Sequence, residues 1–269
     1  MSIFRDDALA GRRAFITGGG TGICKGIALA FARHGAKVAI ASRKAEHLEP
    51  TVEELRALGA EAVAVTCDVR DYAAVEAALE RAANDLGGLD TVVNGAAGNF
   101  LAPAVALSSN AFRTVVEIDL VGTFHVSKAA FPHLSAAADL PAGRTSSILN
   151  ISATLQYGGT PMQGHAASAK AGVDALTKNL AVEWGSAGVR VNAIAPGPIG
   201  DTEGMKRLAP GEMGQKMMAR IPLKRFGRTE EIGDAAVFLS SDAASYVNGA
   251  ILVVDGGQWL TGLSFLDEV

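Results

Sequence analysis

The stretch that decides the fold reads Thr17-Gly18-Gly19-Gly20-Thr21-Gly22-Ile23-Cys24-Lys25-Gly26. It follows a short apolar run and opens directly into a helical pattern. Glycines at such a turn let the backbone approach a pyrophosphate, and the helix N-terminus offers free N–H groups and the positive end of its dipole. We therefore predict a dinucleotide site here, against the alternative of a tight turn that binds nothing. The residues expected to hold the cofactor are Thr17, Gly18, Gly20, Thr21, Gly22 and Ile23.

Outside this turn, short apolar runs alternate with longer amphipathic stretches, a pattern typical of a parallel sheet covered by helices on both faces. Expected strands are Ala14–Thr17, Lys37–Ala41, Ala62–Cys67, Thr91–Asn94, Ser147–Ile151, Arg190–Ile194 and Ile251–Val254. Expected helices are Gly22–His34, Ala45–Leu58, Tyr72–Leu86, Asn110–Leu134, Pro161–Trp184 and Thr229–Ser240. Pro50 should kink or delay the second helix. We predict the α/β class: one doubly wound Rossmann domain over residues 1–269 with a seven-stranded parallel sheet.

The longest stretch expected to be irregular is Pro196–Pro222, with Gly200, Gly204, Pro210, Gly211 and Gly214 spread through it. Loops of this length in compact domains are usually functional. Because it follows a strand, we expect a lid over the substrate.

Composition narrows the functional classes. The 269 residues are 49% hydrophobic and 19% charged, with a formal net charge of -4, and no basic cluster suits nucleic acid. No apolar run reaches the length of a membrane span. Cys24 and Cys67 lack metal-ligand spacing, so we expect free thiols and no metal. Met1–Ala10 lacks a signal peptide's apolar run and Phe265–Val269 lacks a peroxisomal address, so we expect a cytoplasmic protein.

The residues after the second strand bear on the choice of nucleotide. An acidic side chain there would bind the ribose 2′-hydroxyl of NAD, whereas a basic one accommodates the 2′-phosphate of NADP. The sequence has Ser42, Arg43 and Lys44 and no carboxylate. NADP(H) is therefore favoured, against the alternative that Arg43 only faces solvent.

Further motifs extend the pattern along the chain: Asp68-Val69, Asn94-Gly95-Ala96-Ala97-Gly98, Pro196-Gly197-Pro198-Ile199, Tyr246-Val247-Asn248-Gly249 and Val253-Val254-Asp255-Gly256-Gly257. Together with the glycine turn they resemble the short-chain dehydrogenase/reductase family over nearly the whole length. The resemblance implies that Asp68 and Val69 hold the adenine. It also implies that Asn94, Ala96, Ala97 and Gly98 line the cofactor cleft, and that Pro196, Gly197, Ile199 and Thr202 flank the nicotinamide.

The catalytic residues typical of this family are missing. The family uses a Tyr four residues before a Lys, and a Ser thirteen residues before that Tyr. With Lys170 as the lysine, these two positions hold Ala166 and Ala153. Ordinary alcohol–ketone chemistry is therefore in doubt.

Another acid lies on an unexpected helix face. Asp119 interrupts an apolar stripe of the helix expected at Asn110–Leu134, and Lys170 shares the apolar stripe of the helix expected at Pro161–Trp184. Helices that follow neighbouring strands can lie side by side, so the two could meet near the cofactor. Their burial and mutual charge would tune both for acid–base work. The alternatives are a structural ion pair or an oligomer contact.

An Asp–Lys pair in place of the usual Asn, Tyr and Ser resembles the peroxisomal-type 2,4-dienoyl-CoA reductases, a branch of this family. The segment His165-Ala166-Ala167-Ser168-Ala169-Lys170 agrees with that branch. The resemblance implies NADPH-dependent reduction of a 2,4-dienoyl-CoA to a trans-3-enoyl-CoA by Asp119 and Lys170, in a homotetramer. The acyl-CoA contacts it implies are Arg70, Phe100, Ser108, Ser109, Asn110 and Arg207.

Two other functions stay open on the sequence. One is a reductase for another acyl thioester, a ketone or an alcohol, with Tyr157 as the acid. The other is an inactive NADP(H)-binding sensor, because losing Tyr and Ser is also how an enzyme loses activity. His125 and His165 are interpreted as ordinary helix-side residues.

Overall fold

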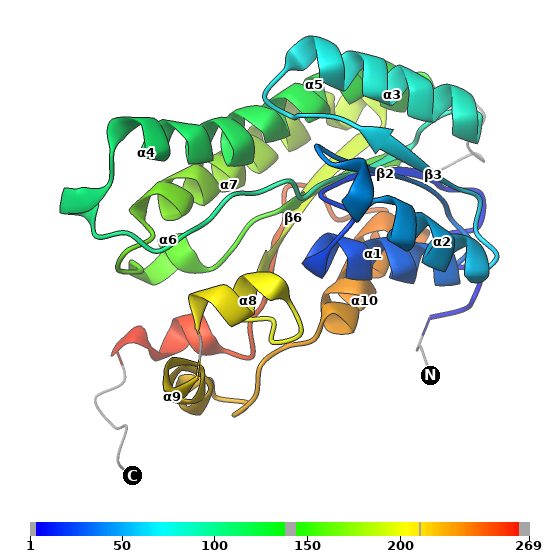
Figure 1. Cartoon of the computed structure of the whole chain (residues 1–269). Helices are drawn as coiled ribbons and strands as arrows, with labels where there is room; N and C mark the ends of the chain where they lie inside the picture. Colours follow the sequence, from blue (N-terminus) through cyan, green and yellow to red (C-terminus); the bar gives the residue numbers. More distant parts are fainter. Residues whose placement is uncertain (1–3, 138–143, 210, 264–269) are drawn as a thin grey trace.

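The computed structural model describes residues 4–137, 144–209 and 211–263. Its described part contains one sheet of seven strands, all paired in parallel, in the order β3-β2-β1-β4-β5-β6-β7. This confirms the predicted fold class (Figure 1). The strands are β1 (Arg13–Thr17), β2 (Lys37–Ser42), β3 (Ala62–Thr66), β4 (Thr91–Asn94), β5 (Ser146–Ile151), β6 (Val189–Pro196) and β7 (Ile251–Val254).

Helices cover both faces of the sheet, as Figure 1 shows. One layer consists of α1 (Gly22–Arg33), α2 (Glu49–Ala57) and α10 (Thr229–Ser240), and the other of α3 (Tyr72–Leu86), α4 (Ser109–Val116), α5 (Gly122–Ser135) and α7 (Gly164–Trp184). Every residue of β1, β4, β5 and β6 is buried. These strands are therefore covered on both faces, which accounts for their almost continuous apolar sequence.

Two helices differ from the prediction, one in where it begins and the other in its hydrogen-bond pattern. The helix expected at Ala45–Leu58 starts with a 3₁₀ turn, η1 (Ala45–His47), and α2 begins only at Glu49, because Pro50 is tolerated in a first turn and not inside a helix. The helix expected at Asn110–Leu134 forms, but its hydrogen-bond pattern changes in the middle. A π turn, η3 (Glu117–Val121), separates α4 from α5 and contains Asp119.

The prediction that Pro196–Pro222 is irregular is wrong. Two helices form within it, α8 (Glu203–Leu208) and α9 (Glu212–Arg220). The Thr202 hydroxyl accepts a hydrogen bond from the Met205 N–H (3.1 Å) and so caps α8. The glycines that suggested a loop lie mostly at the ends of these helices. The remaining short elements are α6 (Leu155–Gly158), η2 (Ala104–Ala106), η4 (Gly185–Ala187), η5 (Asp242–Ala244) and η6 (Gln258–Leu263).

A charged cluster lies at the amino ends of the strands. Asp90, fully buried before β4, accepts from the Arg13 guanidinium (Nε–Oδ2 3.1 Å), and Arg12 lies 3.7 Å from its other oxygen. At the start of β6, the Arg190 guanidinium donates to the Leu239 carbonyl (2.9 Å). The amino edge of the sheet is thus held by paired charges and hydrogen bonds.

Among the described residues, no helix is long and apolar enough to cross a membrane. The segment Phe265–Val269, used in predicting the location of the protein, lies outside the described residues. So do the first three residues of the Met1–Ala10 segment.

Candidate active site

The glycine turn joins β1 to α1 at the carboxyl edge of the sheet. Gly18 has a φ of 71°, and a Cβ there would lie 2.8 Å from the Gly95 carbonyl oxygen. At Gly20 a Cβ would lie 2.4 Å from the His47 carbonyl oxygen. Thr21 is the N-cap residue of α1, and in the described part of the chain its side chain makes no capping hydrogen bond to the first N–H groups of the helix. This narrow, uncapped cradle fits a phosphate group.

The turn after β4 lies beside it, because the strand order makes β1 and β4 neighbours. The Thr17 hydroxyl accepts from the N–H groups of Gly95 (3.0 Å) and Ala96 (3.1 Å) and so ties the two turns together. Asn94 donates to the side-chain oxygen of Asn150 (2.8 Å). Thr17 and Asn94 are both buried, and their side chains hold the turns.

Cys24 lies in the first turn of α1, close to Gly95 in the turn after β4. A Cβ at Gly95 would lie only 1.9 Å from the Cys24 sulfur. The thiol therefore fills space that the absent side chain of Gly95 leaves. Burial raises the pKa of Cys24 to about 12, so the thiol stays protonated and unreactive.

The residues expected to choose the nucleotide lie at the end of β2. Arg43 and Lys44 are exposed, and the Lys44 ammonium lies 3.2 Å from Glu46. The Ser42 hydroxyl donates to the Lys44 carbonyl (3.0 Å), which fixes this turn. The Arg43 side chain is left facing the surface beside the glycine turn, where it can meet a 2′-phosphate.

Asp68 and Arg70, expected to bind different ligands, bind each other. The Arg70 guanidinium donates to both carboxylate oxygens of Asp68, at 3.0 and 2.6 Å. This hydrogen bonding lowers the pKa of Asp68, and the charge of Arg43 adds to the effect. The Asp68–Arg70 pair therefore lies near Arg43, on the adenine side of the expected site.

Asp119 and Lys170 meet. The Lys170 ammonium lies 3.5 Å from Asp119 Oδ2 and donates to the Ile151 carbonyl at the end of β5 (2.8 Å). Asp119 Oδ1 accepts from the Gly98 N–H (2.7 Å). The two residues are 1% and 7% exposed, so the ion pair is shielded from bulk water. It links the turn after β4 to the end of β5.

The π turn explains how Asp119 reaches this position. The Thr123 hydroxyl donates to the Asp119 carbonyl (2.7 Å), which satisfies a backbone group in the altered helix. Gly122 follows at once, and a Cβ there would lie 2.5 Å from Val69. The helix therefore lies close against the segment after β3. Single π turns of this kind often occur at functional sites.

Burial raises the pKa of Asp119 above its usual value. The Lys170 charge and the Gly98 N–H oppose this shift, since both favour the carboxylate. The Asp119 side chain is thus suited to hold a proton at a higher pH than an exposed carboxyl group.

Tyr157, the alternative acid, interacts with Asp174. Burial and the nearby Asp174, to which it hydrogen bonds, raise its pKa to about 12. Asp174 also accepts from Ser152 (2.5 Å) and from Gln156 (2.7 Å). These side chains form a cluster around Asp174 beside the Lys170 helix.

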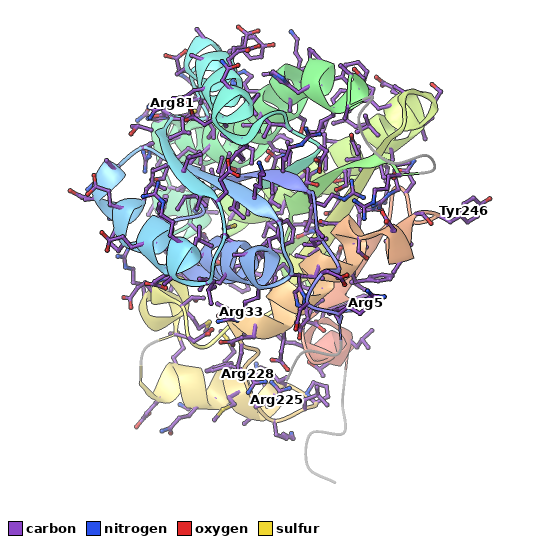
Figure 2. All side chains as sticks on the ribbon, turned by 90° about the vertical axis from the view of Figure 1, so that its right-hand side faces the viewer. Arg5, Arg33, Arg81, Arg225, Arg228 and Tyr246 are labelled. Atoms are coloured by element: carbon purple, nitrogen blue, oxygen red, sulfur yellow. The ribbon has the colours of Figure 1, made fainter. Side chains whose placement is uncertain are left out.

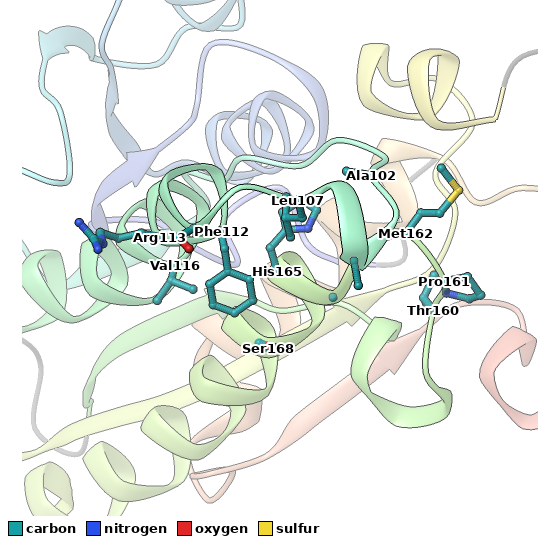
Figure 3. Close-up of a pocket in the computed structure, with 13 residues that line it drawn as sticks. Ala102, Leu107, Phe112, Arg113, Val116, Thr160, Pro161, Met162, His165 and Ser168 are labelled. Atoms are coloured by element: carbon teal, nitrogen blue, oxygen red, sulfur yellow. The ribbon is translucent and has the colours of Figure 1, made fainter.

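A cavity of about 830 Å³ lies between α4 and the start of α7 (Figure 3). Of the expected acyl-CoA contacts, Ser109 lines the cavity, and Phe100 packs on the lining residue His165.

The Ser108 hydroxyl caps α4 by accepting a hydrogen bond from the Ala111 N–H (3.2 Å), and Asn110 is exposed. Arg207 is exposed on α8 and is not among the lining residues. Further lining residues that the sequence did not assign to the site include Phe112, Arg113, Met162 and His165, the last of which was interpreted as an ordinary helix-side residue.

The segment after β6 is held in place by close packing. A Cβ at Gly197 would lie 2.5 Å from the Asp255 Cβ, so glycine is required where β6 and β7 end together. Ile199 bridges to Gly227 ahead of α10, and the Thr202 hydroxyl donates to the Ile199 carbonyl (2.8 Å). Pro196, Gly197, Ile199 and Thr202 thus follow the same sheet edge as the glycine turn.

The fold and this edge define an oxidoreductase of the dinucleotide-binding class. Residues 18–258 match the family model described as enoyl-(acyl carrier protein) reductase. The chain belongs to the short-chain dehydrogenase/reductase family.

Particular relatives are similar over most of their length. The chain is 47% identical to the peroxisomal 2,4-dienoyl-CoA reductase [(3E)-enoyl-CoA-producing] of Arabidopsis thaliana, over 97% of this chain and 88% of the relative. It is 44% identical to the Saccharomyces cerevisiae enzyme of the same description, over 99% and 90%. A solved structure from Agrobacterium tumefaciens, described as a candidate 2-deoxy-D-gluconate 3-dehydrogenase with bound NADP, superposes with a TM-score of 0.85 at 36% identity, covering 96% of this chain and all of that one.

Proposed function

We propose that the protein reduces 2,4-dienoyl-CoA to trans-3-enoyl-CoA with NADPH, in the breakdown of unsaturated fatty acids. The observation that carries this proposal is the buried Asp119–Lys170 pair, 3.5 Å apart, in a chain with alanine at the family's Tyr and Ser positions. The dienoyl-CoA reductases similar to this chain support the same substrate class.

The residues present fit NADP(H). The glycine cradle has no room for a side chain at Gly18 or Gly20, the N-cap residue of α1 makes no side-chain cap, and Arg43 stands where an NAD site would have a carboxylate. NADPH supplies the hydride when it is bound. In this proposal Thr17, Gly18, Gly20, Thr21, Gly22 and Ile23 hold the pyrophosphate, and Ser42, Arg43 and Lys44 hold the 2′-phosphate. Asp68 and Val69 hold the adenine. The nicotinamide half lies along Asn94, Ala96, Ala97, Gly98, Lys170, Pro196, Gly197, Ile199 and Thr202.

Asp119 and Lys170 supply the proton. Hydride addition at the delta carbon leaves a dienolate, and a proton must then reach the alpha carbon. Asp119 holds that proton at a carboxyl oxygen and passes it through a bound water, while the Lys170 ammonium, 3.5 Å away, stabilises the carboxylate that remains. Because burial raises the pKa of Asp119, the proton is retained nearer to neutral pH.

The acyl-CoA is expected to lie between α4, α7 and the 196–222 segment. Phe100, Ser108, Ser109 and Asn110 belong to the segment that borders the cavity, and Arg70 and Arg207 carry charges suited to CoA phosphates. Helices α8 and α9 serve as the lid in this proposal. We further propose a homotetramer that acts in the cytoplasm.

The test is turnover of 2,4-hexadienoyl-CoA. The purified protein is mixed with this thioester and NADPH, and loss of the diene and nicotinamide absorbances is followed, with NADH in parallel. We expect oxidation of NADPH that depends on the thioester and yields a 3-enoyl-CoA. Tight NADPH binding without turnover would discard the dienoyl-CoA proposal and favour another redox substrate or a sensor.

A further inference from the structure

His165 is a buried polar side chain that the proposed mechanism does not use. It lies in the first turn of α7 and is fully buried. Neither ring nitrogen forms a hydrogen bond of normal geometry with the described residues. The Phe100 backbone interacts with the ring and favours its protonated form. Buried polar atoms are almost always paired, so an unpaired imidazole in a candidate site indicates a ligand contact.

The position of His165 puts it beside both the reacting pair and the cavity. Its ring packs on Phe100 with centroids 4.4 Å apart, and it lines the cavity of about 830 Å³. Figure 3 shows it in the middle of the lining, between Phe112 of α4 and Met162. Asp119 is close enough for its charge and that of His165 to act on each other's protonation.

The protonation state of His165 suits a neutral hydrogen-bond donor. Burial lowers its pKa below the usual value, against the opposing charge of Asp119. The positive end of the α7 dipole further disfavours an imidazolium in the first turn. A neutral imidazole carries one N–H donor and one acceptor nitrogen.

Two donors beside the reacting pair are absent or already engaged. The family's Tyr and Ser hydroxyls are absent, since Ala166 and Ala153 occupy their positions. The Ser152 hydroxyl donates to Asp174, and Lys170 is held by Ile151 and Asp119. His165 directly precedes Ala166, and neither of its ring nitrogens forms a hydrogen bond of normal geometry with the described residues.

We propose that His165 donates a hydrogen bond to the thioester carbonyl oxygen of the acyl-CoA and stabilises the negative charge which that oxygen gains. When hydride forms the new C–H bond at the delta carbon, the diene electrons move toward the thioester oxygen. The imidazole N–H bond stays intact, and the proton that reaches the alpha carbon comes from the Asp119–Lys170 pair. This inference rests on the proposed dienoyl-CoA reduction.

The variant His165→Phe removes both nitrogens and keeps an aromatic ring against Phe100. Loss of one oxyanion donor typically lowers kcat by about 10²- to 10³-fold, and we expect a loss in this range with unchanged NADPH affinity. His165→Gln keeps an N–H donor and should recover part of the loss. Since the nitrogens form no hydrogen bond of normal geometry with the described residues, we expect His165→Phe to keep or raise the Tm.

A spectroscopic readout separates this role from a structural one. A donor on the carbonyl draws electron density along the conjugated diene and shifts its absorption to longer wavelength. We expect 2,4-hexadienoyl-CoA bound with NADP⁺ to show that shift in the wild type and the Gln variant, and to lose it in the Phe variant.

The outcomes distinguish this inference from the proposed function. A wild type that fails to reduce the dienoyl-CoA overturns the proposed function and the inference with it. An active wild type whose Phe variant keeps both the turnover and the spectral shift overturns the inference alone. A Phe variant whose Tm falls markedly also overturns it, because the imidazole is then structural.

Discussion

At the scale of single residues, the acid group of Asp119 can be separated from its backbone contact. Asp119→Asn keeps an oxygen that can accept a hydrogen bond from the Gly98 N–H, as Asp119 does at 2.7 Å. The variant loses the ionisable proton. We expect kcat to fall by about 10²- to 10⁴-fold, the usual range for general acid catalysis, with NADPH affinity unchanged. Stopped-flow turnover and fluorescence titration measure the two quantities.

Asp119→Ala serves as the matched variant. It removes the Gly98 contact as well, so it should resemble Asp119→Asn in kcat and also show a lower Tm. Equal losses of turnover and NADPH affinity in the Asn variant would contradict the assignment of Asp119 as the acid.

Arg43 is expected to distinguish NADP from NAD. Arg43→Ala should weaken NADPH binding by on the order of tenfold, since a hydrogen bond to a charged group is lost, and leave NADH binding unchanged. Isothermal titration with both nucleotides measures this. Arg81→Ala, an exposed arginine on α3, is the control (Figure 2). An equal loss for both nucleotides would mean that Arg43 does not read the 2′-phosphate.

Much of the candidate site could be predicted from residue types and their order. Asp119 stood out because a carboxylate is unusual in an apolar helix stripe, and Lys170 because its family partners were missing. His165 could not be recognised in this way. A histidine on a helix face is common, and only the structure shows that this one is buried with both nitrogens unpaired.

At the scale of elements, the start of α10 depends on one charged side chain. Glu231 accepts from the Arg228 N–H (2.9 Å) and pairs with Arg225 (2.6 Å); Figure 2 labels both arginines. Hydrogen bonding from Arg225 lowers the pKa of Glu231 to about 2 from an ordinary 4.5. The stability it contributes is therefore fully present above pH 4.5 and is lost as the pH falls toward 2.

We expect Glu231→Gln to lower the free energy of unfolding by about 1 kcal/mol at pH 7, the usual scale for a helix cap. The difference from the wild type should shrink as the pH falls through the range from 4.5 to 2. Chemical denaturation at several pH values measures it. A difference that stays constant with pH would mean that the charge of Glu231 does not contribute.

Some elements could not be predicted because the deciding interactions are remote in sequence. The π turn at Glu117–Val121 is followed by Gly122, which packs closely against Val69, a contact that no local pattern reveals. Helices α8 and α9 are short and glycine-flanked, so their composition resembled a loop. By contrast, β4, β7, α3 and α10 were predicted with their observed ends, because strong local signals bound them.

At the scale of the whole molecule, the chain reverses its direction across the sheet at β1 in the order β3-β2-β1-β4-β5-β6-β7, and right-handed crossovers in the two directions put helices on both faces. Assembly depends instead on surface residues. Phe112, Phe124 and Val182 are exposed apolar side chains on α4, α5 and α7. Apolar side chains gathered on exposed helices mark a candidate interface.

We expect light scattering to give four times the chain mass of 27.6 kDa. Phe124→Glu should reduce the mass, since a charge buried at an interface is unfavourable. Leu58→Glu, exposed to a similar extent after α2, should not. A monomer in the wild type would contradict the tetramer.

The paired charges around Asp90 imply that local unfolding is rarer at the amino edge of the sheet than at the carboxyl edge. Amide hydrogens next to Arg13 and Arg190, at the amino edge, should exchange with deuterium only when the whole molecule unfolds. Those of the 95–100 turn and of α8 and α9 should exchange through smaller fluctuations. Each sample would thus contain its own reference: protection that NADPH or an acyl-CoA adds at the carboxyl edge can be measured against amides that neither ligand affects.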